Sequence, residues 1–153
     1  MQSVRQLSLK GRALRLLAAR EHSRAELERK LAEYAESAEQ LNTTLNDLQA
    51  KGFIDEQRVV DSVLYRRASK LGAQRIRQEL QAKGLAPEAV QAAVGELKAT
   101  ELERAAEVWR KKFGQTPSNP AERMRQQRFL LSRGFASEVV AKLLKGAIAP
   151  LEE

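Results

Sequence analysis

A basic residue, a glycine and an apolar residue follow one another three times in this chain, each time after a segment rich in helix-forming residues: Lys51-Gly52-Phe53, Lys83-Gly84-Leu85 and Arg133-Gly134-Phe135. The basic side chain complements the negative end of a helix dipole. The glycine adopts the left-handed backbone conformation that closes a last turn, and the apolar residue packs back against that turn. Each copy therefore predicts the end of a helix.

The second and third copies lie 50 residues apart, and the similarity extends on both sides of them. A shift of 50 residues superposes apolar positions: Leu80 on Leu130, Val90 on Val140 and Val94 on Leu144. A shift of 49 residues does the same upstream, for Leu27 on Ile76 and Leu31 on Leu80. A fixed helical period is typical of stacked repeats, so we predict an all-α protein of three tandem three-helix repeats in an elongated, curved array. Such arrays offer long binding surfaces more often than catalytic clefts.

Capping signals set the bounds of the predicted repeats. Ser23 followed by Glu26 is a capping box, Asp55 is a helix N-cap, and Asn119 with Pro120 begins another helix. These signals predict nine helices in three triplets, over residues 1–54, 55–98 and 99–153, with a tail that frays after Gly146. Each repeat is too small to bury a large core of its own.

The composition argues against most catalytic and metal sites. The chain has no cysteine, and its single histidine, His22, lies beside a helix start, where we expect a surface or capping role. One histidine cannot build a multi-histidine metal site, and no glycine-rich phosphate loop is present. We therefore expect no catalytic residue, no metal and no cofactor. Apolar runs are too short for a signal peptide or a spanning helix, so we expect a soluble cytoplasmic protein.

Positive charge is spread over all three predicted repeats, and the formal net charge is +7. Residues 5–30 carry eight Lys and Arg against three acids, residues 58–83 carry seven against two, and residues 104–133 carry eight against two. A positive surface of this length favours an anionic partner, either nucleic acid or an acidic protein groove. A basic, solvated surface without such a partner is the alternative.

Several of these cations have no acid at helical spacing. Arg66 and Lys70 form a like-charge pair four residues apart, and Arg125 and Arg128 form one three residues apart. Arg77 has no acid three or four residues away. Because unpaired like charges destabilise a helix slightly, an external anion is our preferred explanation for them.

Other polar and aromatic positions have structural explanations. We expect two acid–base pairs of the first repeat to form a solvated face, Arg24–Glu28 and Glu26–Lys30. Three aromatic side chains could stack on bases, but core packing is the preferred interpretation for each of them: Tyr65, Trp109 and Phe129.

Four segments, in order along almost the whole chain, resemble the RecX family of bacterial regulatory proteins. They are residues 11–27, Gly52-Phe53-Ile54-Asp55-Glu56, Arg75-Ile76-Arg77-Gln78-Glu79-Leu80 with Lys83-Gly84, and Arg128-Phe129-Leu130-Leu131-Ser132-Arg133-Gly134-Phe135. One departure precedes the third segment, where the family commonly has Lys-Gly-x-Gly-Pro and this chain has residues 70–74, Lys-Leu-Gly-Ala-Gln. Without that proline and one glycine, we expect a less rigid turn.

The resemblance implies a modulator of RecA, the recombinase that polymerises on single-stranded DNA. RecX proteins bind along the groove of the RecA filament and suppress ATP hydrolysis, strand exchange and coprotease activity. The expected role is therefore that of a non-enzymatic inhibitor, monomeric by default, in contact with the RecA nucleoprotein filament. We expect the anion-facing residues to be Arg66, Lys70, Arg75, Arg77 and Lys83, then Arg123, Arg125 and Arg128, then Arg24 and Arg29.

Two other functions remain open at this point. A DNA-binding module that acts without RecA would use the same basic surface, and a sequence-preferring footprint without RecA would favour it. An enzyme would need a metal or cofactor bound without cysteine or a histidine cluster. The sequence also leaves open whether the contact is with DNA or with RecA, and whether inhibition caps filament ends or coats the groove.

Overall fold

The computed structural model describes residues 7–148, which form nine α-helices and one 3-10 turn and contain no strand. The helices are α1 Leu9–Ala19, α2 Arg24–Leu31, α3 Ala38–Ala50, α4 Glu56–Arg67, α5 Ala73–Ala82, α6 Pro87–Ala99, α7 Glu101–Lys112, α8 Pro120–Ser132 and α9 Ser137–Ile148, and the 3-10 turn η2 spans Ala32–Tyr34. The all-α prediction is confirmed.

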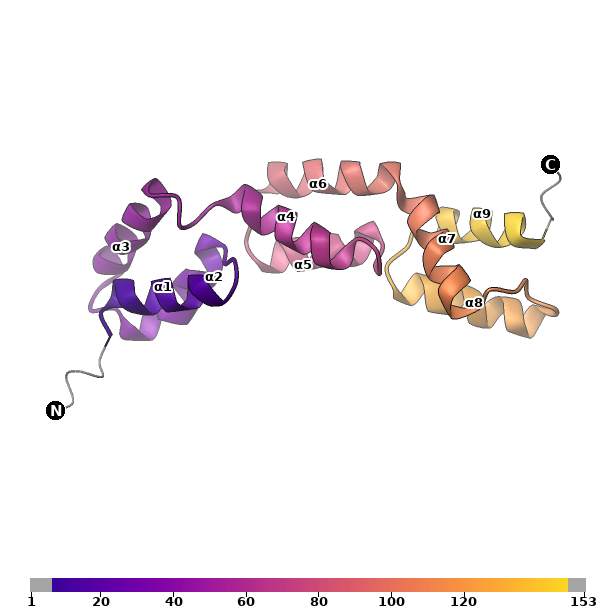
Figure 1. Ribbon diagram of the computed structural model, residues 1–153, viewed down its shortest axis with the longest axis horizontal. Helices are drawn as coiled ribbons and strands as arrows, with labels where there is room; N and C mark the ends of the chain where they lie inside the picture. Colours follow the sequence, from indigo (N-terminus) through magenta and orange to yellow (C-terminus); the bar gives the residue numbers. More distant parts are fainter. Residues whose placement is uncertain (1–6, 149–153) are drawn as a thin grey trace.

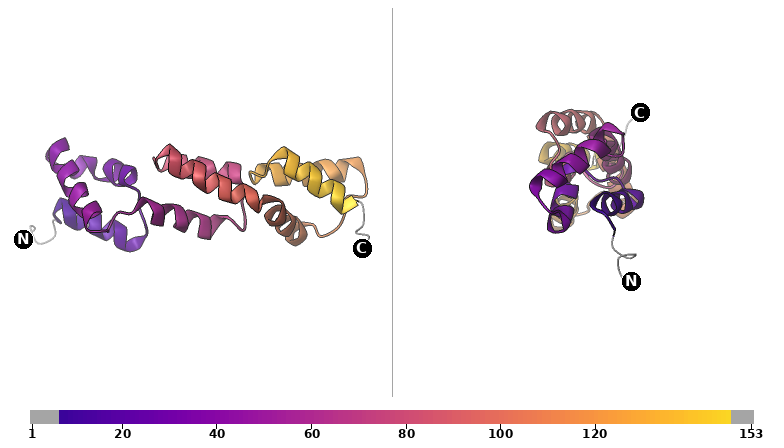
Figure 2. Two further views of the ribbon diagram at one scale, coloured as in Figure 1. Left: turned by 90° about the horizontal axis from the view of Figure 1, so that it is seen from above. Right: turned by 90° about the vertical axis from the view of Figure 1, so that its left-hand side faces the viewer.

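The helices gather in three groups that follow one another along a single long axis (Figures 1 and 2). Each group encloses a hydrophobic cluster of its own, one among α1–α3, one among α4–α6 and one among α7–α9. Leu27, Ile76 and Leu130 are buried in the three clusters, from the second helix of each group. The array of three three-helix repeats is confirmed, and we propose residues 1–54, 55–98 and 99–153 as units 1, 2 and 3.

The three predicted helix ends are present, with glycines at φ of 85°, 72° and 93° for Gly52, Gly84 and Gly134. The amide of Phe135 donates to Leu130 O at 3.3 Å, which closes the last turn of α8 as expected. The apolar residue is buried after Gly84 and Gly134, but Phe53 is 45% exposed. The packing prediction is therefore wrong at Phe53, whose motif ends the third helix of its unit rather than the second.

The second helices of the three units, α2, α5 and α8, follow one another end to end. At the first of the two contacts between them, the end of α8 meets the start of α5. The amide of Gly72 donates to Arg133 O at 2.8 Å, and the amide of Gln74 donates to Gly134 O at 3.2 Å. First-turn amides of one helix thus find acceptors among last-turn carbonyls of another, so the two helix dipoles align head to tail. We call this contact joint 2–3.

A buried carboxylate completes joint 2–3. Glu101, the first residue of α7, is 3% exposed and accepts from the amides of Ala73 at 3.0 Å and Ala136 at 2.9 Å. Since these amides begin α5 and precede α9, one side chain satisfies donors from both units. Gly72 leaves no room for a side chain, since a Cβ there would collide with the Gly134 carbonyl.

The end of α5 meets the start of α2 at the equivalent place, with a side-chain hydroxyl instead of a backbone amide as the donor, and we call this contact joint 1–2. The Ser23 hydroxyl donates to Lys83 O at 2.5 Å, and the Arg24 amide donates to Glu56 Oε2 at 3.3 Å. The predicted capping box is present, and its Glu26 also binds Lys83 Nζ at 3.2 Å. Burial raises the pKa of Glu26, but hydrogen bonds from Arg20, the Ser23 amide and Lys83 outweigh that effect and lower it to about 2.

The structure corrects two expectations about this region. Of the two roles expected for His22, the surface role is wrong, because the residue is 1% exposed. Its ring contacts the carbonyl oxygen of Arg20, the residue at the end of α1, through Nδ1 and Lys30 Nζ through Nε2, each at 3.0 Å. Burial lowers the pKa of His22, and the charges of Arg20 and Lys30 lower it further. Glu26 is buried between Arg20 and Lys83 instead of forming a solvated pair with Lys30. Long-range docking of unit 2 displaced the local pairing.

The end of the array differs from the prediction. Helix α9 continues through Gly146 to Ile148, and the rest of the tail that we expected to fray, residues 149–153, lies outside the described residues.

Replacement of Gly72 by alanine tests the joint. We expect Gly72→Ala to destabilise the protein by about 1–3 kcal/mol, because the new methyl group must displace the Gly134 carbonyl. Gly95→Ala is the matched control: nothing lies within 4 Å of the added Cβ in α6, so it should be neutral or stabilising by up to about 1 kcal/mol. Thermal unfolding measures both, and equal stability of the two variants would refute close docking at joint 2–3.

Acid should destabilise the protein in two steps, the first at His22 inside unit 1 and the second at Glu26 in joint 1–2. The pKa values of His22 and Glu26 are lower in the folded protein than in the unfolded chain. As pH decreases, the unfolded chain therefore binds protons first, and the free energy of unfolding decreases. The His22 step begins below the ordinary pKa of 6.5, and the Glu26 step runs from 4.5 toward 2. In urea denaturation measured from pH 8 to pH 3, the free energy of unfolding should decrease by about 2 kcal/mol in the second step. Glu26→Gln should abolish that step alone; an unchanged pH profile would contradict the assignment.

Candidate functional site

A groove of about 480 Å³ lies beside joint 2–3, on helices of both units. Five of the residues that line it are cationic and none is acidic: Arg67, Lys70, Arg75, Lys111 and Arg133. Leu71, Val108 and Phe129 form its apolar part. The first three cations belong to unit 2 and the last two to unit 3. We call this feature the cationic groove.

Most of the charge in the cationic groove has no internal counterion. Arg67 binds Glu79, with Nε and Oε1 3.1 Å apart. Among residues 7–148, no carboxylate oxygen lies within 4.0 Å of the charged nitrogens of the other four cations, Lys70, Arg75, Lys111 and Arg133. Clustered like charges repel one another, so this site attracts an anion.

Contacts to neutral groups hold two of these arginines in place. Arg75 Nη1 donates to Ser132 O at 2.7 Å, which ties α5 to the end of α8. The guanidinium of Arg133 lies over the Phe129 ring, 4.6 Å from its centroid. The Phe129 ring, which lines the groove, also packs edge-on against Phe113.

The turn that carries Lys70 is held from outside. Arg104 Nη1 donates to Ala68 O at 2.7 Å and to Leu71 O at 2.8 Å, while Glu101 lies 3.8 Å from the same guanidinium. Burial lowers the pKa of Arg104, and the charge of Glu101 opposes that change. We expected a loose turn because a glycine and a proline are missing here, yet these bonds from unit 3 fix its carbonyls.

Two of the predicted site residues, Lys70 and Arg75, line the cationic groove together. Arg66 lies beside Arg67 at the end of α4. Both arginines bind Glu79, and Arg66 Nη2 lies 4.0 Å from Glu79 Oε2. Glu79 lies four residues after Arg75 on α5, at a spacing that allows an ion pair, but its carboxylate binds these two arginines of α4 instead.

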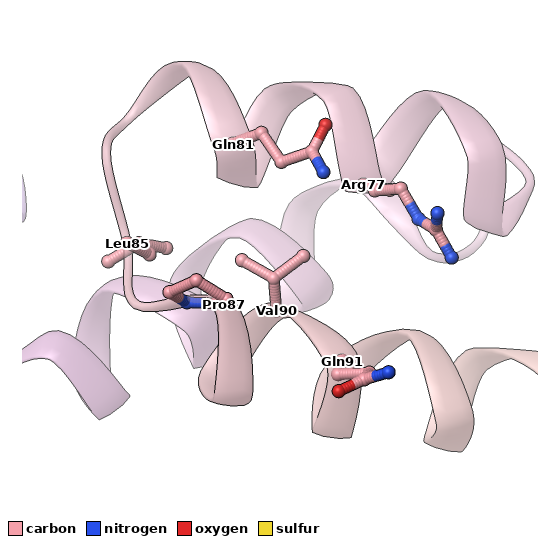
Figure 3. A pocket seen from close by; sticks show the side chains of 6 residues that line it. All are labelled: Arg77, Gln81, Leu85, Pro87, Val90 and Gln91. Carbon is pink, nitrogen blue, oxygen red and sulfur yellow. The ribbon is translucent and has the colours of Figure 1, made fainter.

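Arg77 lies elsewhere, in a groove of about 320 Å³ between α5 and α6. Figure 3 shows its guanidinium at the opposite end of this groove from Leu85, with Val90 pointing from α6 toward α5 between them. Gln81 and Gln91 supply the other polar groups of the lining. Arg75 and Arg77 are thus both available to anions but do not share one face.

The other predicted residues of units 1 and 2 take part in joint 1–2. Lys83 is paired with Glu26, and its side chain is only 13% exposed. Arg24 binds Glu28 at 3.2 Å, and Arg29 Nη2 donates to Ala82 O at 3.2 Å. Lys83 and Arg29 thus hold units 1 and 2 together, whereas the side chain of Arg24 bonds within unit 1, to Glu28, Asn42 and Gln49.

The three predicted residues of α8 lie outside the two grooves. Arg125 is exposed and pairs with Glu122 at 3.3 Å, Arg128 is exposed, and Arg123 is half-buried. Among residues 7–148, no ion pair involves Arg123 or Arg128.

Three groove residues were missing from the predicted set: Arg67, Lys111 and Arg133. Lys111 belongs to a basic run with one nearby acid, a visible signal, and the structure shows that Arg110 occupies that acid, Glu107. Arg133 was assigned only a role at the end of a helix. Lys83, which lies 50 residues earlier at the same position of the repeated motif, was included in the predicted set.

The aromatic predictions divide. Trp109 and Phe129 are half-buried in the core of unit 3, and Trp109 Nε1 donates to Gln126 Oε1 at 2.8 Å. Tyr65 is 91% exposed on α4, so its assignment to the core is wrong.

Over residues 7–148, no group of three or more His, Asp or Glu side chains is arranged to hold a metal ion. No helix in the same range is long and apolar enough to cross a membrane.

Models of three RecX three-helix domains match this chain: the first over residues 10–48, the second over 55–94 and the third over 99–144. Among curated relatives, the regulatory protein RecX of Leptothrix cholodnii is 56% identical over 92% of this chain and 89% of its own length. The regulatory protein RecX of Ralstonia nicotianae is 44% identical over 96% of this chain and 92% of its own length.

Two crystal structures share the fold. RecX from Lactobacillus salivarius has a TM-score of 0.76 and 18% sequence identity, covering 93% of this chain and 96% of that one. Another structure of regulatory protein RecX has a TM-score of 0.75 and 22% identity, covering 90% of this chain and 71% of that one. The domain order, the identity of the relatives and the shared fold show that the chain belongs to the RecX family of regulatory proteins.

Proposed function

We propose that this protein binds the RecA filament on single-stranded DNA and lowers its ATPase, recombinase and coprotease activities. It acts without catalysis, as a monomer in the cytoplasm. The observation that carries the proposal is family membership, together with a cationic groove that has four cations without an internal counterion. A filament that contains DNA offers anions along a groove, and an elongated array suits such a surface.

The effect on RecA ATPase tests the proposal. When this protein is titrated into RecA on single-stranded DNA, the ATPase rate should fall at molar ratios well below one molecule of this protein per RecA. Arg75→Glu with Arg77→Glu should abolish the effect, because it reverses charge in both grooves.

Lys142→Glu with Lys145→Glu is the matched control. It makes the same change in net charge on α9, outside both grooves, and should inhibit like the unaltered protein. No inhibition at any ratio would refute the RecA role and leave DNA binding independent of RecA. Equal inhibition by the Arg75→Glu/Arg77→Glu variant would refute the assignment to the grooves.

A further inference from the structure

The two joints place different charges at equivalent positions. The period of 49 residues that superposes Leu27 on Ile76 also superposes Glu26 on Arg75, and the period of 50 superposes Lys83 on Arg133. In joint 1–2, the acid and the base of this pair form an ion pair at 3.2 Å. In joint 2–3, both positions are arginines, and both line the cationic groove.

The hydrogen bonds at the two joints support this equivalence. Lys83 O accepts from the Ser23 hydroxyl in joint 1–2, and Arg133 O accepts from the Gly72 amide in joint 2–3. Similarly, Glu56 and Glu101, each the first residue of its helix, accept from the amides of Arg24 and Ala73. Joint 2–3 therefore has contacts equivalent to those of joint 1–2, but it has an arginine instead of a carboxylate at the position equivalent to Glu26.

We propose that a phosphate takes the place of this missing carboxylate, so that a phosphodiester segment of the DNA strand binds in the cationic groove and bridges units 2 and 3. This deepens the proposed function, on which its place in the filament rests. Arginine binds phosphate through paired N–H donors, and Lys70 and Lys111 add one positive charge from each unit. A single carboxylate neutralises one cation, whereas a strand presents successive phosphates to all four.

Arg75→Glu separates this proposal from a purely structural role. It restores at joint 2–3 the acid–base pair of joint 1–2, so the melting temperature without ligand should hold or rise despite the loss of the bond to Ser132. An unlabelled oligothymidylate should raise the melting temperature of the unaltered protein but not that of Arg75→Glu. A clear fall in the melting temperature of Arg75→Glu without ligand would overturn the equivalence of the joints.

Binding of a fluorescent oligothymidylate, followed by anisotropy at several salt concentrations, tests the site directly. Lys70→Ala with Lys111→Ala should weaken binding at least tenfold and reduce the slope of log K against log salt by about 1.4, since each lost phosphate contact contributes about 0.7. Lys142→Ala with Lys145→Ala, which removes the same charge from α9, should bind like the unaltered protein. Equal affinity and slope for the groove variant would overturn the proposal.

A competition experiment identifies the source of the phosphate, and a comparison of DNA binding with RecA inhibition tests the DNA site separately from the proposed function. Inorganic phosphate should displace the oligonucleotide only at far higher concentration; displacement at equal phosphate concentration would overturn the strand as ligand. If the groove variant binds oligonucleotide normally while the protein still inhibits RecA, the site fails and the regulatory role stands. If the groove binds DNA but RecA is unaffected, the site stands and the proposed function fails.

Discussion

End-to-end docking of helices α8, α5 and α2 is the contact on which the rest of the structure depends. A helix exposes amides at its start and carbonyls at its end. Across joint 2–3, amides at the start of α5 donate to carbonyls at the end of α8, and across joint 1–2 the Ser23 hydroxyl donates to Lys83 O at the end of α5. Each three-helix unit has only a small core, so these polar contacts define how the units stand relative to one another. The cationic groove exists because joint 2–3 brings α4 and α5 against α7 and α8.

Much of the fold could be predicted from the sequence, because helix ends and apolar periods are local signals. The glycines at 84 and 134 and the capping box at Ser23 were predicted and are present. The errors concern contacts between segments. His22 and Glu26 resemble surface residues when only the neighbouring sequence is considered, yet both are buried, His22 against Arg20 and Lys30 and Glu26 against Lys83 in joint 1–2.

The site was less predictable for the same physical reason. Spacing along one helix showed which cations lack a local acid, but Glu79 pairs with Arg66 and Arg67 on another helix rather than with Arg75. Arg75 and Arg77 are two residues apart and so point to different sides of α5, one toward unit 3 and the other toward α6. Only the internal period, applied to charged as well as apolar positions, relates Arg133 to Lys83 and marks both as joint residues.

The row of docked helices also has two distinct ends, which argues against continued docking between copies. At one end, α2 passes into η2 and has no left-handed glycine, so it lacks the motif by which α5 and α8 dock. At the other end, the first turn of α8 is already capped, because Asn119 Oδ1 accepts from the Glu122 amide and Glu122 accepts from the Ser118 amide, each at 2.8 Å. Within the described residues, the end of α2 thus lacks the glycine motif found at the ends of α5 and α8, and the start of α8 already has a side-chain cap, so neither end of the row repeats the docking seen at the two joints.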